Sequence, residues 1–259
     1  MTVERSVFEH YIRDYLQLTP RQIDYCPNGL QIEGTSKISK IATGVTASLA
    51  LIEKTIETGA EALLVHHGLF WQKDPYPIVG YRKKRIEQAI KANLNVFAYH
   101  LPLDAHTEIG NNVQLAKLLG LEFDRYWVVD ASFPTLGWIG QTSEKITLGD
   151  LTQVIQHKLN REPLLISPAL TNPSLSKIFK IAICTGAAQK LITELPEDVD
   201  IFITGEASES TTHLAQELGV HFYAAGHHAT ERYGIKALGE HLAKQFGLTH
   251  CFLDMDNPV

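Results

Sequence analysis

Two seven-residue stretches of this chain repeat each other, and this self-similarity restricts the fold more than any other feature. Residues 115–121 and 242–248 are identical at five of seven positions. The match extends backward, because Lys40-Ile-Ala and Lys180-Ile-Ala each open a strand-like run that leads into a Thr-Gly pair and a helix-like segment. Matches in the same order indicate a duplicated supersecondary unit. We therefore predict an α/β fold of two related domains that arose by internal duplication.

The predicted domains divide the chain near residue 130. Residues 1–130 form the first α/β domain in this interpretation. Residues 131–259 contain an inserted, structured segment and the second repeat, and the C-terminal segment can pack against the first domain. With 259 residues, of which 44% are hydrophobic, the chain is long enough for about two domains with hydrophobic cores. Residues 168–176, rich in Pro, Asn, Ser and Thr, are expected to form a loop.

Hydrophobic periodicity and turn residues place the expected helices and strands. Apolar residues at helical spacing predict a first helix that ends near Thr19. Further helices are expected at residues 48–58, 82–92, 111–119 and 148–159. Strands are expected at residues 38–45, 62–67, 94–99, 136–140, 163–168 and 200–206. Strands that alternate with helices are typical of α/β proteins with parallel sheets.

Charge and cysteine content exclude several classes of protein. The formal net charge of -6 argues against broad binding to nucleic acid, which needs a cationic surface. The three cysteines are far apart and form no CxxC motif, so neither a disulfide framework nor a thiolate zinc site is indicated. The N-terminus lacks a signal-peptide pattern, and no apolar run reaches the ~18 residues of a membrane span. A cytoplasmic protein is expected.

Two adjacent histidines, His66 and His67, close an apolar strand-like run and are followed by Gly68. The rings would lie at the carboxyl end of a strand, where open α/β sheets bind their ligands. In the repeat, His66 falls opposite Glu206, which ends the corresponding strand-like run. A pair of imidazoles at this place indicates metal coordination. The alternative is that one ring fills core space while the other faces water.

Two further segments carry side chains that bind metals. His227 and Glu231 are four residues apart, so they share one face if a helix begins there. Asp104 follows an expected strand, and His100 or His106 could orient its carboxylate. The alternatives are an ordinary polar first turn of a helix and a solvated loop carboxylate.

Together these segments predict one metal site. The candidate ligands are His66, His67, Asp104, His227 and Glu231. Three imidazoles and two carboxylates suit Zn, Mn, Fe, Co or Ni better than Ca or Mg. Five side chains are too many for one catalytic zinc with an open position and too few to saturate two ions. A dinuclear centre that activates water for hydrolysis is therefore the simplest inference.

Several of these motifs resemble the GTP cyclohydrolase I type 2 family, also called the Nif-three-like family. The motifs are PNGLQ, HHGLFW, HLPLDAH followed by GNN, TGE and YAAGHHATER, and they are most similar to proteobacterial YbgI-like members. The resemblance spans residues 25–258, and GHHATE is its most specific motif. It implies two related α/β domains, a homohexameric toroid and a dinuclear metal centre. The family's metal positions correspond to the same five residues.

The resemblance also implies a reaction, the opening of the imidazole ring of GTP with release of C8 as formate. His100 or Glu206 could move the proton in this reaction. The basic residues 82–85 could bind a triphosphate, or they could form a solvated first turn of a helix. Cys26 is interpreted as a small buried thiol rather than a nucleophile.

Two functions of different classes therefore follow. The first is a metal-dependent hydrolase that acts on a nucleotide. The second is a ring-shaped, metal-binding scaffold or regulator without catalytic turnover. A third possibility, a toroid that encircles nucleic acid, is disfavoured by the negative charge.

Overall fold

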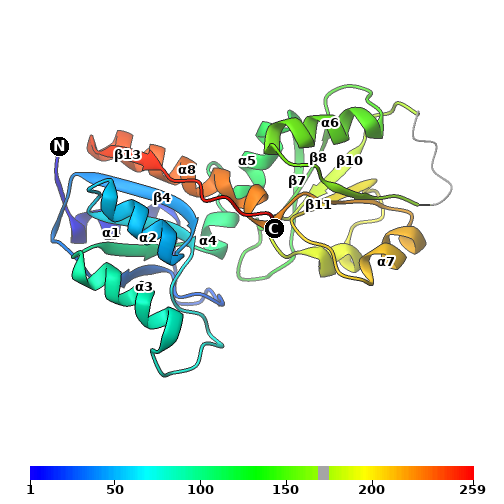
Figure 1. Cartoon of the computed structure of the whole chain (residues 1–259). Coiled ribbons are helices and arrows are strands. Elements are labelled where there is room, and N and C mark those ends of the chain that lie inside the picture. Colours follow the sequence, from blue (N-terminus) through cyan, green and yellow to red (C-terminus); the bar gives the residue numbers. More distant parts are fainter. Residues whose placement is uncertain (169–174) are drawn as a thin grey trace. The chain divides into compact units, whose positions relative to one another are not determined.

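The computed structural model describes residues 1–168 and 175–259, and these residues divide into two compact units (Figure 1). Unit 1 contains residues 1–103 and 234–256, and unit 2 contains residues 104–233 and 257–259. The division therefore lies earlier than residue 130, because the segment after residue 104 packs into the core of unit 2. Residues 169–174 of the expected loop lie outside the described residues.

Unit 1 is built on a five-stranded sheet with the order β13-β4-β5-β6-β2. Its strands are β13 (Thr249–Phe252), β4 (Lys40–Thr46), β5 (Ala62–His67), β6 (Asn95–Ala98) and β2 (Gly29–Ile32). The first four strands are parallel to their neighbours, and β2 pairs antiparallel with β6. A separate antiparallel pair joins β1 (Val3–Glu4) to β3 (Lys37–Ile38).

Helices cover both faces of the unit 1 sheet. On one face, α2 (Leu49–Glu57) and α3 (Gly80–Lys91) share a hydrophobic core with alternate residues of the strands (Figure 1). On the other face, Phe8 of α1 (Arg5–Tyr15) packs against Phe97 of β6 and Phe246 of α8 (His227–Phe246), with ring centroids 5.6 and 5.8 Å apart. The sheet is therefore buried on both sides, as parallel sheets are.

Unit 2 contains a six-stranded sheet with the order β7-β8-β10-β11-β12-β9. Its strands are β7 (Leu121–Trp127), β8 (Gly137–Thr142), β10 (Lys180–Ile183), β11 (Ile201–Thr204), β12 (His221–Ala224) and β9 (Leu164–Ile166). The three strands β10, β11 and β12 are parallel, and the other strands pair antiparallel.

The helices of unit 2 also bury both faces of its sheet. One core is formed by α5 (Asn111–Leu118) and α6 (Leu148–Leu159) against the inward residues of β10 and β11. Phe202 and Phe222 belong to the opposite set of strand positions and contact each other, with ring centroids 5.6 Å apart. The short helices η1 (Gln189–Glu194) and α7 (Thr211–Leu218) contact each other, and α7 contacts β12.

Local capping explains why several predicted helix boundaries are accurate. The Ser48 side chain accepts a hydrogen bond from the amide of Leu51 at the start of α2. Thr147 and Asp150 form a capping box at the start of α6. The first helix, in contrast, ends at Tyr15 rather than near Thr19. The left-handed backbone of Gln17, with φ of 53°, closes α1 before the proline at position 20 is reached.

The α/β fold class predicted from the sequence is confirmed by this architecture. The matched segments Lys40-Ile-Ala and Lys180-Ile-Ala open β4 and β10, the first strands of two similar runs. In each unit three consecutive parallel strands are followed in space by one antiparallel strand. This shared topology is compatible with duplication, which stays a prediction about the origin of the chain.

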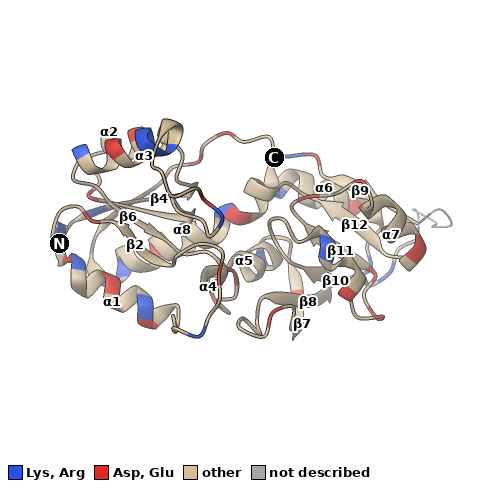
Figure 2. Cartoon of the chain, turned by 90° about the horizontal axis from the view of Figure 1, so that it is seen from below, with Lys and Arg blue, Asp and Glu red and all other residues tan. Residues whose placement is uncertain are grey.

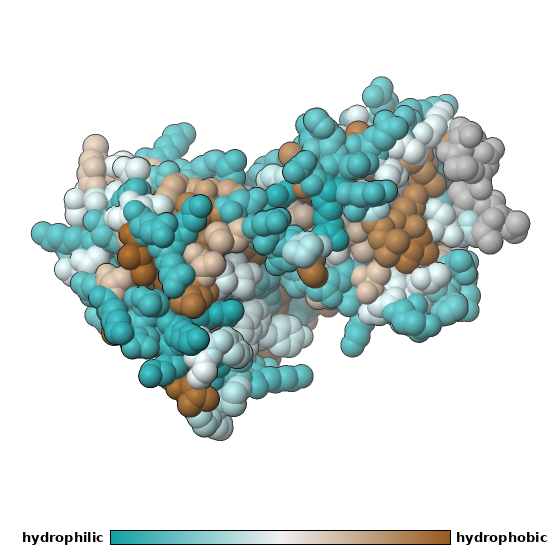
Figure 3. All heavy atoms as spheres, in the orientation of Figure 1, coloured by the Kyte–Doolittle hydropathy of each residue, from teal (hydrophilic) through white to brown (hydrophobic). Residues whose placement is uncertain are grey.

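In the ribbon of Figure 2, basic and acidic residues alternate along α1, α2 and α3. The face in Figure 3 is largely hydrophilic and carries separate hydrophobic patches. Exposed large apolar side chains gather before α3 and in its first turn: Tyr76, Ile78, Val79 and Tyr81. Among the described residues, no helix is long and apolar enough to cross a membrane.

Candidate metal centre

The histidine pair lies where the sequence predicts it, at the carboxyl end of β5. This strand runs between β4 and β6, so its end is held in place by both neighbours. His66 is fully buried, and its Nδ1 lies 2.9 Å from the carbonyl oxygen of Tyr99. Nδ1 of His67 lies 3.0 Å from Oγ1 of Thr46, on the neighbouring strand. In both rings Nδ1 is engaged, so Nε2 is the nitrogen that points away from these partners.

His100 joins this pair in unit 1. Its ring centroid lies 5.0 Å from that of His66 and 5.8 Å from that of His67. One ring nitrogen from each of the three residues lies within 4.8 Å of the others. We call His66, His67 and His100 the histidine cluster. Its nitrogens are close enough together to hold a metal ion.

Asp24 also belongs to the candidate site, and no motif in the sequence indicates it. Its carboxylate accepts a hydrogen bond from Nδ1 of His100 at 2.6 Å, and it also accepts bonds from Asn28 Nδ2 at 2.9 Å and the Leu101 amide at 3.0 Å. Burial raises the pKa of Asp24, but these bonds and the charge of His100 outweigh it and hold the pKa below its ordinary value. The carboxylate therefore fixes His100 with Nε2 available.

In unit 2, His227 and Glu231 lie on one helix, as their spacing in the sequence predicts. Helix α8 begins at His227, so Glu231 lies one turn later on the same face. Nε2 of His227 is 3.1 Å from Oε2 of Glu231, and its Nδ1 is 2.6 Å from Oε1 of Glu206. Burial lowers the pKa of His227, but the hydrogen bonds and charges of Glu231 and Glu206 raise it to about 9.

Asp104 lies in the same unit and is also buried. It ends the short helix α4 (Leu101–Asp104), and its Oδ1 accepts a hydrogen bond from Asn111 Nδ2 at 2.7 Å. Burial raises the pKa of the Cys184 thiol, and the charges of Asp104 and Glu231 raise it further. Both carboxylates therefore lie near this thiol. We call Asp104, His227 and Glu231 the unit 2 ligand group.

His106, which the sequence proposed as an orienting partner of Asp104, closes a local turn. Its Nδ1 faces the amides of Glu108 and Ile109, at 3.2 and 3.3 Å. Asn111 provides an orienting bond to Asp104 that the sequence analysis did not foresee. An amide at the start of the helix that follows was the available signal.

Two glycines leave room for the unit 2 ligand group. A Cβ atom at Gly186 would overlap Oε1 of Glu231 and lie 3.3 Å from Nε2 of His227. A Cβ atom at Gly205 would lie 2.5 Å from Cα of His227. Gly186 also has a left-handed backbone, with φ of 71°, which favours glycine. The segments that follow β10 and β11 therefore approach α8 closely because glycine occupies positions 186 and 205.

The donor set fits divalent transition metals. His66, His100 and His227 each have Nδ1 against an oxygen that can only accept, a carbonyl or a carboxylate. Nδ1 must then carry the proton, so that Nε2 is the atom that would bind metal. His227 must first lose the proton on Nε2, which faces Glu231. This orientation by carbonyl or carboxylate partners is typical of metal-binding histidines. The histidine cluster could therefore hold a metal ion through these nitrogens.

Arg82 and Cys26, which the sequence also brought into question as site residues, make contacts typical of residues that stabilise the fold. Arg82 is buried, donates to the carbonyl oxygens of Pro75 and Pro77 and pairs with Asp74 at 3.5 Å. This guanidinium is therefore occupied by the preceding loop and does not favour the phosphate-binding interpretation of residues 82–85. Cys26 is buried, and burial raises the pKa of its thiol, as expected for a packing residue.

Comparisons with known proteins agree with the resemblance seen in the motifs. A family model described as Duf34/NIF3 (NGG1p interacting factor 3) matches residues 3–258. The chain is 47% identical over 244 residues to a protein of Vibrio cholerae named GTP cyclohydrolase 1 type 2 homolog, covering 93% of this chain and 95% of that one. A Haemophilus influenzae protein of the same name is 49% identical over 237 residues, covering 91% and 92%.

Solved structures of similar proteins share the fold of this chain. The ybgI protein, described as of unknown function, has a TM-score of 0.91 and 40% identity, covering 99% of this chain and 100% of that one. Protein TTHA1606 from Thermus thermophilus has a TM-score of 0.87 and 34% identity, with the same coverage. Both similarities extend over the whole fold.

Proposed function

Because the chain belongs to the Duf34/NIF3 family, we propose that it is a metal-dependent hydrolase that acts on a nucleotide. The observation that carries this proposal is the set of histidines whose Nδ1 atoms are fixed by oxygen acceptors while Nε2 remains directed elsewhere. The relatives named GTP cyclohydrolase 1 type 2 homolog make GTP the first substrate to test.

We propose that His66, His67, Asp104, His227 and Glu231 hold two divalent ions, chosen from Zn, Fe, Mn, Co and Ni. The first two histidines come from unit 1, and the other three ligands come from unit 2. Mixed nitrogen and oxygen ligands favour these metals. When bound, two such ions activate water and polarise the bond under attack.

We propose that His100 and Glu206 take part in proton transfer during the reaction. Asp24 holds the Nδ1 proton of His100, so Nε2 of this ring can accept a proton from a water or donate one to a leaving group. Glu206 holds Nδ1 of His227 through a bond of 2.6 Å and is half-buried, so its contribution is to orient that ring as well as to carry charge.

The function is tested by loading chelator-treated protein with each metal in turn and offering a panel of nucleotides. We expect GTP to be hydrolysed with release of formate by at least one metal form and not by the metal-free protein. Full turnover by the metal-free protein would exclude the proposal.

Replacing Asp24 by Asn is expected to lower kcat by roughly a hundredfold with little change in KM. An amide can donate to Nδ1 of His100 and so stabilise the ring with the proton on the wrong nitrogen. The metal content should stay unchanged, which separates this effect from loss of the site. Asp14→Asn is the matched control, because Asp14 pairs with His10 on the exposed surface of α1. Equal activity of both variants would show that Asp24 is not needed to position His100.

Metal affinity is expected to rise with pH up to about 9, because His227 keeps its proton below that value in the metal-free chain. A metal must displace this proton, so each pH unit below the pKa should weaken binding by roughly tenfold. Metal titrations across this range measure the slope. Glu206→Gln removes one of the carboxylates that raise the pKa, and the break should then move to lower pH. A flat profile in the wild-type chain would contradict this assignment.

A scaffold or regulatory role is the second candidate. The exposed apolar side chains of residues 76–81 favour it, because such surfaces contact other proteins. A homohexameric ring, implied by the family resemblance, also remains our proposal, and light scattering would then give six times the chain mass of 28.9 kDa. Absence of hydrolysis at full metal occupancy would favour the scaffold role.

We also propose a cytoplasmic location, which the three free cysteines support.

A further inference from the structure

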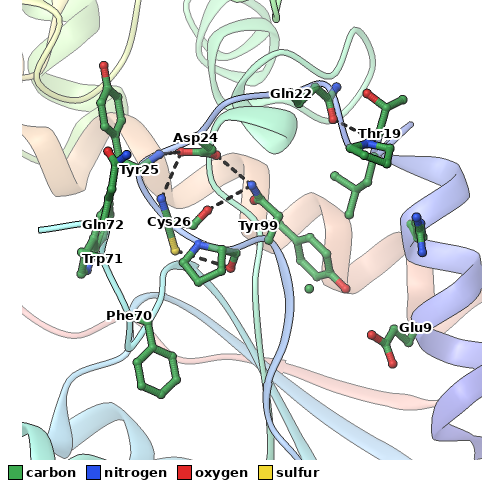
Figure 4. A pocket seen from close by; sticks show the side chains of 16 residues that line it. Glu9, Thr19, Gln22, Asp24, Tyr25, Cys26, Phe70, Trp71, Gln72 and Tyr99 are labelled. Carbon is green, nitrogen blue, oxygen red and sulfur yellow. Dashed lines mark hydrogen bonds between the residues drawn. The ribbon is translucent and has the colours of Figure 1, made fainter. Parts of the chain in front are cut away.

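A cavity of about 630 Å³ opens in unit 1 beside the Asp24–His100 pair (Figure 4). It lies between α1 and two loop segments, residues 18–29 and 70–72. Asp24 and Asn28 line it while also bonding to His100. Pockets of this size accommodate small organic ligands. A molecule bound here would therefore lie next to the residue that we propose as a proton carrier.

One end of the cavity presents an unused hydrogen-bond donor. The side chain of Tyr99 is fully buried, and its hydroxyl has no hydrogen-bond partner among the described residues. The ring starts at the end of β6 and directs its hydroxyl toward the Glu9 side of the cavity (Figure 4). Burial raises the pKa of Tyr99, and the charge of Glu9 raises it further, so the hydroxyl keeps its proton. A buried hydroxyl without a partner is costly and indicates a site for a ligand atom.

The acceptor at this end is Glu9, a half-buried carboxylate on α1. Its charge acts on Tyr99, yet no hydrogen bond joins the two side chains. A donor and an acceptor that are neighbours without bonding each other can be bridged by one ligand edge. That edge must accept a bond from Tyr99 and donate one to Glu9.

The other side of the cavity is aromatic. Tyr25, Phe70 and Trp71 line it, and Tyr25 lies above Trp71 and Gln72 in Figure 4. Tyr25 is 62% exposed, and the Trp71 ring meets His100 edge-on with centroids 5.2 Å apart. Exposed aromatic faces bind planar heterocycles by stacking.

We propose that this cavity binds a planar nitrogen heterocycle of the nucleobase type, with its donor and acceptor edge between Glu9 and Tyr99 and its faces near Tyr25 and Trp71. This assignment rests on the proposed function in that it gives the substrate of the hydrolase a base-binding subsite. It goes beyond that function because it names residues that are not metal ligands and predicts binding without metal.

The test is calorimetric titration of chelator-treated protein with guanosine and, separately, with ribose 5-phosphate, which lacks the base. Guanosine is expected to bind the wild-type chain, and ribose 5-phosphate is not. Glu9→Gln and Tyr99→Phe should each weaken guanosine binding by roughly tenfold. Tyr99→Phe removes a hydroxyl that no described protein group bonds, so this variant is expected to fold. Glu53→Gln, on the exposed surface of α2, is the matched control and should bind as the wild type does.

The outcomes separate this proposal from the proposed function. Guanosine binding that depends on Glu9 and Tyr99, without hydrolysis by any metal form, would leave the subsite standing and reject the hydrolase. Hydrolysis that is unaffected by both substitutions would reject the subsite alone. No guanosine binding to the chelated wild-type chain, or equal binding to all variants, would also overturn the subsite.

Discussion

Replacing Glu231 by Gln is expected to abolish activity and lower metal affinity by roughly a hundredfold or more. Glu231 is buried on the second turn of α8, and its Oε2 lies 3.1 Å from Nε2 of His227. An amide has nearly the same shape but carries no charge, so it is a much weaker ligand for a divalent ion. The fold should be retained because the packing volume is unchanged.

Metal analysis by mass spectrometry after gel filtration, together with circular dichroism, measures this effect. Glu240→Gln is the matched control, because Glu240 lies on the same helix but is exposed. This control should keep the metal content and activity of the wild-type chain. Full metal content in Glu231→Gln would remove this residue from the ligand set.

Replacing Gly186 by Ala is expected to produce the second largest effect, although Gly186 binds nothing itself. The added Cβ would overlap Oε1 of Glu231, so the carboxylate must move away from its position beside His227. We expect metal affinity to fall by roughly tenfold or more, as it does when the surroundings of a ligand are disturbed. The left-handed backbone adds a general cost in folding stability of roughly 1–2 kcal/mol.

Gly219 provides the control that separates these two contributions. Its φ is also 71°, but an added Cβ meets no atom within 4 Å. Gly219→Ala should therefore lower thermal stability by a similar strain while leaving metal binding unchanged. If both variants bound metal equally well, the close approach of Gly186 to Glu231 would have no functional meaning.

Local patterns explain which parts of the site could be predicted from the sequence. The apolar run before His66 and His67 becomes β5, and the spacing of His227 and Glu231 becomes one turn of α8. Each of these features depends on residues close together in the chain. Their residue types and periodicity are visible without knowledge of the fold.

Long-range contacts explain what could not be predicted. Asp24 and His100 are 76 residues apart, and only the tertiary fold brings them together. Nothing in the basic run at residues 82–85 distinguishes Arg82, whose side chain is buried against the preceding loop. Similarly, the domain boundary depends on where α5 packs, which is a property of the second core rather than of the segment itself.

The most direct test of the central claim is anomalous diffraction from crystals of the metal-loaded protein. We expect two metal peaks per chain, with His66 bonded to one ion and His67 to the other. Asp104, His227 and Glu231 should complete the coordination of these ions. A single ion bonded to both His66 and His67, or no metal bonded to either histidine, would contradict the dinuclear centre.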